Sequence, residues 1–497
     1  MNANPVDGGL SVDSEVSVTT TRCTDGCAPD EGLGALEVRV RYWSVASDWD
    51  VPEEGIVGHV PLAGESPKIR RGWNMYYDIP PEDAVPLASL IIQGRLSFND
   101  TLIDGTPRTY ELISHIIAIE LGELFIGSAE KPYENYALIT LLGNEDSPVY
   151  SYSNSVTAGN KIIFVTGNFV AYGKDPIDGG KYQTKLQVPC KPEDTSIYVE
   201  PGLKWKPGQK IALAPSGYNE EQHEEFTIIA YNDATGEIEL NKKIEYNHYG
   251  SSYDEQEGAF TYDMRAEVAM ISRNIKIRGD LENKWGGQIF VTEWTNPVTE
   301  TTFAGRLLFR YVELIRMSQH DTMHAAIRLR SLRTNIGQIT ECSIHHSNGI
   351  ALFVLDAHSV TFNNNVIYRT LRNAVVVRIT NDFEMMNNLI LSNEARNWNP
   401  EVQLRDFQVA VDVCTGEMVT ACRNIKIQNN VVAAGKGVAF AAPSADCSSV
   451  ETETATQNSF KNNRAHSVYA GLISHVNNAI QAPYCGLVQD FTVHHAS

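Results

Sequence analysis

The chain has 497 residues, of which 42% are apolar and 20% are charged, a composition typical of a folded globular protein. Its formal net charge of −21 disfavours nucleic acid or an anionic membrane as the general partner. The longest apolar runs, residues 375–377 and 438–442, are far shorter than the roughly 20 residues of a membrane-spanning helix. Residues 1–5 lack the basic start and apolar run of a signal peptide, so the sequence fits either an intracellular protein or a fragment of a secreted one.

Short runs of β-branched residues follow a polar leader. Residues 1–36 are rich in Ser, Thr, Gly and Asp and predict a loose acidic segment. The later runs are bounded by turn residues, as strands are, and they include residues 90–92, 96–98, 116–119, 124–127, 162–165, 195–199 and 210–213. This half of the chain shows no sustained apolar period near about 3.6, so strands rather than helices are expected.

An asparagine pair followed by apolar residues recurs in the last third of the chain. Its first members are Asn364, Asn387, Asn429 and Asn462, and the first two copies lie 23 residues apart. Repeats of this length predict solenoid coils, and a short strand without a helical pattern in each coil predicts a parallel β-helix. We expect these four asparagines to occupy one corner of successive coils and to form a hydrogen-bonded ladder.

The eight cysteines permit disulfides. Cys23 with Cys27, and Cys414 with Cys422, are the expected close pairs. No spacing typical of a zinc site, a phosphate-binding loop or a calcium loop is present, so no metal and no cofactor are expected, and the acidic run 220–225 is expected to be a hydrated loop. Asn99 begins an Asn-Asp-Thr sequon and is a candidate glycosylation site.

Several motifs resemble a known family. Trp43-Ser44, Tyr77-Asp78 and the run 90–98 resemble the opening of a G8 domain, and residues 122–127 with 139–143 resemble its close. Further family phrases follow at residues 205–215, 246–250, 263–268, 272–280 and 342–347. The chain is therefore identified, over roughly residues 40–395, as similar to the family of fibrocystin, fibrocystin-L and the cell migration-inducing and transmembrane hyaluronidases.

The resemblance implies an all-β fold in which a β-rich G8 module leads into a right-handed, pectate-lyase-like parallel β-helix. The expected divisions are a leader at 1–36, the G8 domain at 37–155, a β-rich bridging segment at 156–260 and β-helix repeats at 261–497. It also implies an extracellular, cell-surface or ciliary location, as a fragment of a larger protein. The expected partners are an acidic polysaccharide or other surface proteins.

Two substitutions separate this chain from the pattern of its relatives. Where family members typically carry His-Phe-His, this chain has Arg328-Leu329-Arg330, and a second Gly-His phrase is matched by Arg372-Asn373. Guanidinium does not exchange a proton near neutral pH, whereas imidazole does. The resemblance thus favours a non-catalytic, fibrocystin-L-like protein, with a hyaluronidase-like glycosidase acting on an acidic polysaccharide as the alternative.

The arginines themselves suggest a binding site. Arg328 and Arg330 would share one face of a strand, and arginine forms forked, charge-assisted bonds to carboxylates and sulfates. The candidate site for an anionic glycan comprises Arg306, Arg310, Arg328, Arg330 and Arg333. The alternative is a solvated face paired with acidic residues.

Two further polar groups are expected to be structural. Asp263, Arg265 and Glu267 would share one strand face and are expected to form ion pairs. His345 and His346 would point to opposite faces of a strand, so we expect one of them to be buried or to lie at a corner of the coil.

Overall fold

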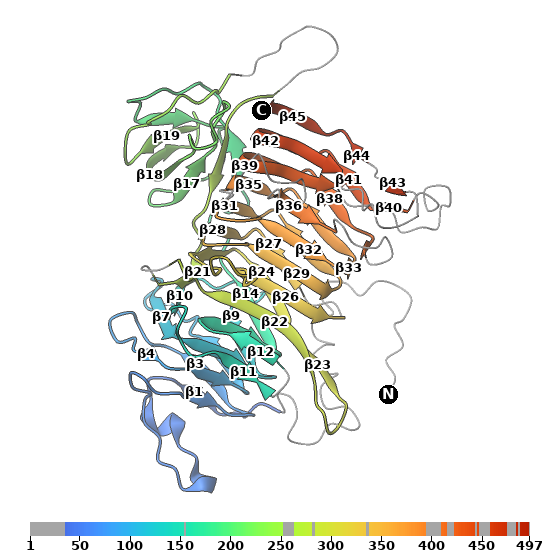
Figure 1. Ribbon diagram of the computed structural model, residues 1–497. Helices are drawn as coiled ribbons and strands as arrows, with labels where there is room; N and C mark the ends of the chain where they lie inside the picture. The colour runs from blue at the N-terminus through green and yellow to red at the C-terminus, as the bar shows by residue number, and fades with distance from the viewer. Residues whose placement is uncertain are drawn as a thin grey trace.

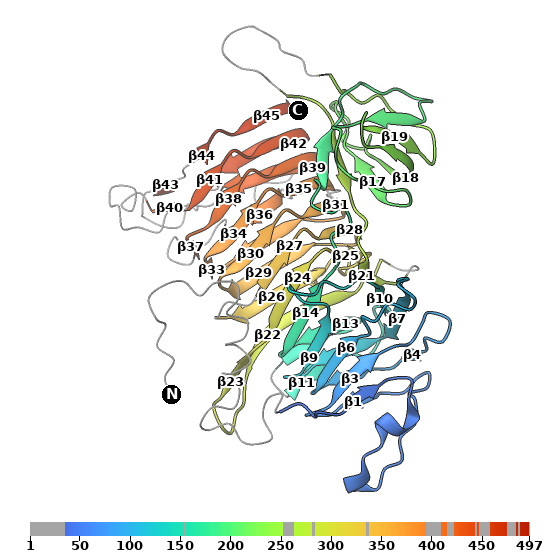
Figure 2. The same ribbon diagram turned by 180° about the vertical axis from the view of Figure 1, so that it is seen from behind.

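The computed structural model describes residues 35–153, 156–251, 263–280, 284–333, 337–393, 409–414, 422–442, 445–446, 458–474, 484–485 and 488–496. Within these ranges the chain consists of strands, turns and two short 3-10 helices, η2 (Ala46–Trp49) and η3 (Pro52–Glu54), with no α-helix. The all-β class is therefore confirmed. Figures 1 and 2 show most of the strands stacked into one column, from β1 at one end to β45 at the other, with β17, β18 and β19 beside it.

Each full coil contributes one strand to each of three faces. Face A is a parallel sheet of 12 strands, and its members are β1 (Val40–Tyr42), β3 (Asn74–Tyr77), β6 (Arg95–Phe98), β9 (Glu123–Ile126), β14 (Asn168–Tyr172), β24 (Arg306–Arg310), β27 (Gly337–Thr340), β30 (Val360–Asn363), β34 (Phe383–Met386), β38 (Lys426–Gln428), β41 (Ser459–Lys461) and β44 (Val488–Gln489). Since strands of successive coils pair in parallel, the architecture is the expected parallel β-helix.

Faces B and C follow face A in each full coil. Face B contains β4 (Pro86–Leu87), β7 (Thr109–Ser114), β10 (Tyr136–Leu141), β21 (Ile275–Gly279), β25 (Val312–Ile315), β28 (Ser343–Ser347), β31 (Val366–Thr370), β35 (Leu389–Asn393) and β45 (Thr492–Ala496). Face C contains β2 (Lys68–Ile69), β5 (Leu90–Ile92), β8 (Ile116–Ile119), β13 (Ile162–Val165), β22 (Gln288–Thr295), β26 (Ile327–Leu332), β29 (Leu352–Ala357), β32 (Val375–Arg378) and β36 (Val409–Val413). Two long strands, β39 (Val431–Ala442) and β42 (Arg464–Ser474), run through both faces.

The interior of the column is apolar because alternate residues of every strand point inward. On face A the inward residues of consecutive coils stack in register, and each is almost fully buried: Ile339, Phe362, Met385, Ile427 and Phe460. At roughly 25 cal/mol per Å² of buried apolar surface, this continuous core is the main stabilising contribution.

The asparagine ladder is present, but the second residue of each pair forms it. The ladder residues are buried: Asn365, Asn388, Asn430 and Asn463. The side-chain NH2 group of each of the first three donates to the side-chain oxygen (Oδ1) of the next asparagine in the ladder, at 3.1, 2.9 and 3.0 Å. Our prediction placed the ladder one residue too early.

The first asparagine of each pair bends the chain. Asn364, Asn387, Asn429 and Asn462 have φ values of 57, 57, 57 and 55°, the left-handed region that asparagine tolerates better than most residues. After this bend the second side chain points into the coil, where a buried amide requires partners. The pair thus combines a corner residue with a ladder residue.

The G8-like coils belong to the same column as the later coils. Strand β10 pairs with β21, β13 pairs with β22 and β14 pairs with β24, all in parallel. The parallel sheets therefore continue from the G8-like coils into the later coils without a break in strand pairing. The division of the sequence into domains at residues 37–155, 156–260 and 261–497 stays a prediction.

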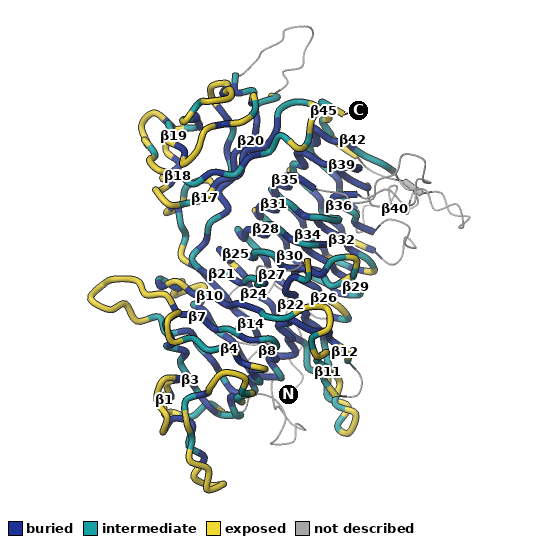
Figure 3. The backbone as a smooth tube through the Cα atoms, turned by 60° about the vertical axis from the view of Figure 1, so that its left-hand side comes forward, coloured by how far each residue is buried: buried dark blue, intermediate teal, exposed yellow. Residues whose placement is uncertain are grey.

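A separate antiparallel sheet is inserted between β14 and β21. Its six strands are β15 (Gln183–Lys185), β20 (Glu267–Met270), β17 (Lys210–Leu213), β18 (Glu224–Asn232), β19 (Glu237–Leu240) and β16 (Ser196–Tyr198). It has its own core, which includes Trp205, Ile211 and Phe226. Figures 1 and 3 show this inserted sheet beside the later coils, where Ala212 and Ile271 pack with Tyr368 and Leu391 of face B.

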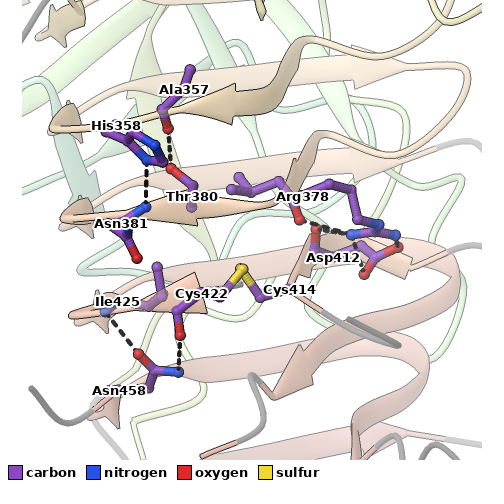
Figure 4. Close-up of a disulfide and its surroundings, with 11 residues drawn as sticks. Ala357, His358, Arg378, Thr380, Asn381, Asp412, Cys414, Cys422, Ile425 and Asn458 are labelled. Atoms are coloured by element: carbon purple, nitrogen blue, oxygen red, sulfur yellow. Dashed lines mark hydrogen bonds and ion pairs between the residues drawn. A yellow bond between two sulfur atoms is a disulfide. The ribbon is translucent and has the colours of Figure 1, made fainter. Parts of the chain in front are cut away.

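One predicted cysteine pair is confirmed. Cys414 and Cys422 form a disulfide with a Cα–Cα distance of 6.2 Å at the end of β36, and Asn458 accepts from the backbone of Ile425 beside it (Figure 4). Cys190 and Cys342 are buried free thiols. Cys23, Cys27 and Cys447 lie outside the described residues.

Candidate glycan-binding surface

The five candidate arginines lie on two different faces. Arg328 and Arg330 belong to β26 of face C, and Arg333 follows that strand, whereas Arg306 and Arg310 belong to β24 of face A. The structure therefore does not bring the five side chains together into one surface.

Arg328 is buried, with 6% of its surface exposed. Its guanidinium lies 3.8 Å from the centre of the Phe290 ring and donates to the Ala158 carbonyl at 2.7 Å. Burial, and next the charge of Arg330, lower the pKa of Arg328 to about 10, so the side chain remains charged at neutral pH. The hairpin of β11 (Tyr150–Tyr152) and β12 (Val156–Gly159) supplies the Ala158 carbonyl.

Two of the other arginines have acidic partners. Arg310 Nε lies 2.5 Å from Glu341 Oε2; burial alone lowers the pKa of Arg310, but the hydrogen bond and charge of Glu341 raise it overall. Arg333 Nε lies 3.7 Å from Glu293 Oε1. Such ion pairs weaken the attraction of Arg310 and Arg333 for an anionic glycan. Arg330, in contrast, is exposed and makes no ion pair with a described residue. The anionic-glycan site stays a prediction.

The remaining residues of interest occupy structural positions. Asn99 lies in a turn after β6, where its side-chain oxygen accepts from the Thr101 amide at 3.0 Å; its glycosylation stays a prediction. His345 is buried and His346 lies at a left-handed bend with φ of 55°, as expected. Asp263 pairs with Arg265 at 2.9 Å, and Glu267 pairs with other partners described below.

Face A carries a polar groove of about 180 Å³ over strands β27, β30, β34 and β38. The outward side chains of these strands lie directly beside one another in the sheet, in the order Gln338, Thr361, Glu384 and Lys426. The bends that precede the strands add Ser359, Asp382 and Asn424 to the lining. The groove is thus built from backbone positions that the parallel ladder fixes.

Hydrogen bonds hold the acidic side of this face A groove. Asn424 donates to Asp382 at 2.6 Å, and Asn363 donates to Glu384 at 2.7 Å. Lys426 Nζ lies 3.7 Å from Glu384 Oε2. The side chains of Gln338, Ser359 and Thr361 make no hydrogen bond to another described residue, so their hydroxyl and amide groups can bind a ligand.

The sequence contains a signal for the face A groove. Gln338, Thr361 and Glu384 follow one another at the same 23-residue step as the asparagine pairs. Polar residues recurring at the coil period on outward positions indicate one surface. The spacing then lengthens, since 42 residues separate Glu384 from Lys426, and this break in the period conceals the rest of the groove.

Coils whose strands pair in parallel, with asparagines at their corners, define a parallel β-helix protein. Residues 54–187 match the G8 domain, which confirms the resemblance drawn from the sequence. The chain is 26% identical to mouse fibrocystin-L over 481 residues, which is 91% of this chain and 11% of that protein. It is 24% identical to dog fibrocystin over 436 residues, or 86% of this chain and 10% of that protein.

The chain thus spans about a tenth of the length of these relatives. It is also 27% identical to the cell surface hyaluronidase of zebrafish over 281 residues, which is 50% of this chain and 20% of that protein. Among solved structures, the tailspike of Pseudomonas phage phi297 aligns with 75% of this chain and 55% of its own, at 8% identity and a TM-score of 0.19.

Two features of the described residues bear on membranes and metals. No helix among them is long and apolar enough to cross a bilayer. Likewise, the described residues contain no group of three or more His, Cys, Asp or Glu side chains suited to holding a metal ion.

Proposed function

We propose that this chain is a non-catalytic rod of an extracellular or cell-surface protein and that it binds glycans in the face A groove. The observation that carries the proposal is the group of polar side chains without a hydrogen bond to a described residue: Gln338 and Thr361 on adjacent strands of the sheet, and Ser359 in the bend before β30. A binding site on regular strands needs little ordering when its ligand arrives.

The chemistry of the groove favours an uncharged glycan. Asp382 and Glu384 supply two carboxylates against the single ammonium of Lys426, so an anionic chain would meet net repulsion. Sugar hydroxyls can donate to these carboxylates and accept from amide and hydroxyl groups. This preference replaces the anionic ligand expected from the arginines, three of which are buried or paired with carboxylates.

An extracellular location agrees with the disulfide. Cys414 and Cys422 are bonded, and disulfides persist mainly in oxidising compartments. Zebrafish cell surface hyaluronidase, one of the relatives, carries a surface location in its name.

The second candidate function is glycoside hydrolysis. Asp382 and Glu384 line one groove, and most glycosidases use two carboxylates that flank the scissile bond. The similarity to a protein named hyaluronidase favours this alternative as well. It requires a protonated acid at one of the two positions, and both already accept hydrogen bonds from asparagine amides.

Binding and chain length should be measured together. We would pass neutral, sulfated and uronic acid-containing oligosaccharides over the immobilised protein at two salt concentrations. The double variant Gln338→Ala with Thr361→Ala removes two hydrogen bonds worth about 1 kcal/mol each, so retention of a neutral glycan should fall about 30-fold. Ser97→Ala, on the same face but outside the groove, is the matched control.

Three results would overturn the proposal. The first is a shortened oligosaccharide, which would support the glycosidase. The second is retention of a neutral glycan that the double variant leaves unchanged. The third is salt-sensitive retention of anionic glycans alone, abolished by Arg330→Ala, because exposed charge pairs are screened by salt.

A further inference from the structure

A segment of the inserted sheet lies along face B of the later coils. We call residues 215–223, which lead into β18, the strap. Ser467 donates to the Gly217 carbonyl at 2.5 Å, Lys436 Nζ lies 2.6 Å from Glu221, and His223 Nδ1 lies 3.0 Å from the Tyr368 hydroxyl. The strap therefore contacts coils from β42 back to β31.

Beneath the strap, a column of left-handed bends interrupts face B. Its members have φ between 48 and 67° and lie beside one another in successive coils: Arg316, His346, Arg369, Ser392, Ala434, Ser467 and His495. At this position of the coil, the side chains of Ser392 and Ala434 are small, whereas those of Arg369 and His346 in the preceding coils are large. The small side chains leave space between the strap and the coils.

That space is a cavity of about 150 Å³, which we call the strap pocket. Its lining comes from both units: Glu220, Glu221 and His223 of the strap, and Ser392, Asn393, Ala434 and Lys436 of the coils. One water needs only about 10–15 Å³ of such space. The strap pocket is therefore large enough for a ligand of several heavy atoms.

Two polar groups of the strap pocket, on Ser392 and Asn393, have hydrogen-bonding capacity that no described residue uses. Ser392 is 3% exposed, yet its hydroxyl makes no hydrogen bond to another described residue. The Asn393 amide nitrogen donates to Thr370 Oγ1 at 3.0 Å and to the Arg372 carbonyl at 2.5 Å, which leaves its carbonyl oxygen for a ligand. Burial, and next the charge of Arg369, lower the pKa of His223 to about 4, so its ring is neutral at pH 7.

We infer that the strap pocket binds a single uncharged sugar unit. An anion is disfavoured because Lys436 already pairs with Glu221 and the Glu220 carboxylate adds a negative charge. An apolar ligand would leave the Ser392 hydroxyl, which lines the strap pocket, without a hydrogen bond. Sugar hydroxyls match the lining, since carboxylates accept and the hydroxyl and ammonium groups donate. This site lies on face B and is independent of the face A groove.

The test uses the whole chain and a panel of methyl glycosides of glucose, galactose, mannose and N-acetylglucosamine, titrated by calorimetry or ligand-observed NMR. We expect at least one glycoside to bind and Ala434→Asn to weaken it about tenfold or more, because asparagine accepts the left-handed bend and fills the strap pocket. Glu220→Gln should weaken binding less, since an amide still accepts one hydrogen bond. Ser97→Ala, outside both sites, is the control and should leave monosaccharide binding unchanged, and the double variant Gln338→Ala with Thr361→Ala tests whether the sugar binds in the face A groove instead.

The outcomes separate this inference from the proposed function. The inference is overturned if no glycoside binds, if Ala434→Asn binds as well as the parent, or if binding requires Ca²⁺ and disappears with Glu220→Gln. Loss of binding in the face A groove variant alone would place the sugar there instead. Equal melting temperatures of the parent and Ala434→Asn are required for each comparison.

Discussion

The Asn388 side-chain amide donates to Asn430 Oδ1 at 2.9 Å, although 42 residues separate the two asparagines. The Asn388 backbone amide donates to the same oxygen at 3.0 Å. The preceding step, from Asn365 to Asn388, spans only 23 residues. The ladder therefore keeps its geometry although the coils differ in length.

Truncation of a ladder asparagine should destabilise the column. Asn388→Ala removes the acceptor of the Asn365 amide and the donor to Asn430, both buried, so we expect a loss of about 3 kcal/mol in the free energy of unfolding. Denaturant midpoints measure the loss. Asn429→Gly is the control, because glycine accepts the left-handed bend; an equal loss in both variants would contradict the role assigned to the ladder.

The repeat length and the asparagine pairs were sufficient to predict the coil. They could not assign the ladder to Asn388 rather than to Asn387, because that choice depends on the left-handed bend at Asn387. The inserted sheet was missed for a related reason. Residues 210–213 of the insertion and 162–165 of the column have the same apolar character, and a single run does not reveal whether its partner strand is parallel or antiparallel.

The arginine site shows where local pattern fails. Alternation predicts Arg328 and Arg330 on one side of β26, but Arg328 is buried and Arg330 exposed, and the burial of Arg328 depends on Ala158, which lies 170 residues away. The face A groove, by contrast, is predictable from the sequence, because Gln338, Thr361 and Glu384 recur at the coil period. Contacts across coils follow the repeat, whereas contacts with inserted hairpins do not.

Glu267 should anchor the inserted sheet to the column. His466 Nε2 lies 2.7 Å from its Oε2, and Arg464 also pairs with it. Burial alone raises the pKa of Glu267, but His466 and Arg464 lower it overall. Glu267→Gln removes the carboxylate with which Arg464 pairs, so we expect a loss of about 3 kcal/mol in the free energy of unfolding and faster hydrogen exchange in β20. Glu239→Gln, exposed on the same sheet, should change neither quantity.

Acid should weaken the contact between the strap and the column. The pKa of His223 is lowered to about 4 by burial and by Arg369, and that of His346 is lowered to about 3, mainly by burial and by His345. Because the unfolded histidines bind protons first, stability should be unaffected above about pH 6.5 and should fall from there towards pH 4.

Denaturant midpoints measured from pH 7.5 to pH 4 test this dependence. His223→Gln and His346→Gln should each flatten the curve between about pH 6.5 and pH 4. His59, whose side chain is 64% exposed, provides the control substitution His59→Gln. An unchanged slope in the first two variants would show that other groups control the acid response.

The disulfide should stabilise the chain by restricting its unfolded state. Cys414 and Cys422 are 8 residues apart, and closing so short a loop contributes about 2 kcal/mol. Replacing both cysteines with alanine should lower the free energy of unfolding by that amount. A reducing agent should lower the parent's stability to the same level and leave the double variant unchanged; sensitivity of that variant to reduction would indicate a second disulfide.

Replacing Arg328 should separate a structural role from a binding role. Its guanidinium is stabilised by the Phe290 ring and the Ala158 carbonyl, but it has no carboxylate partner among the described residues, and its Nε is buried without a hydrogen bond. The cation–π contact contributes about 2 kcal/mol when desolvated, and burial of the charge costs a similar amount. Arg328→Met should therefore change stability by less than about 1 kcal/mol, whereas Arg328→Ala should lose about 3 kcal/mol through the space it leaves. Glycan retention should be equal in the parent and Arg328→Met. A methionine variant that folds normally but no longer retains an anionic glycan would restore Arg328 to the binding site.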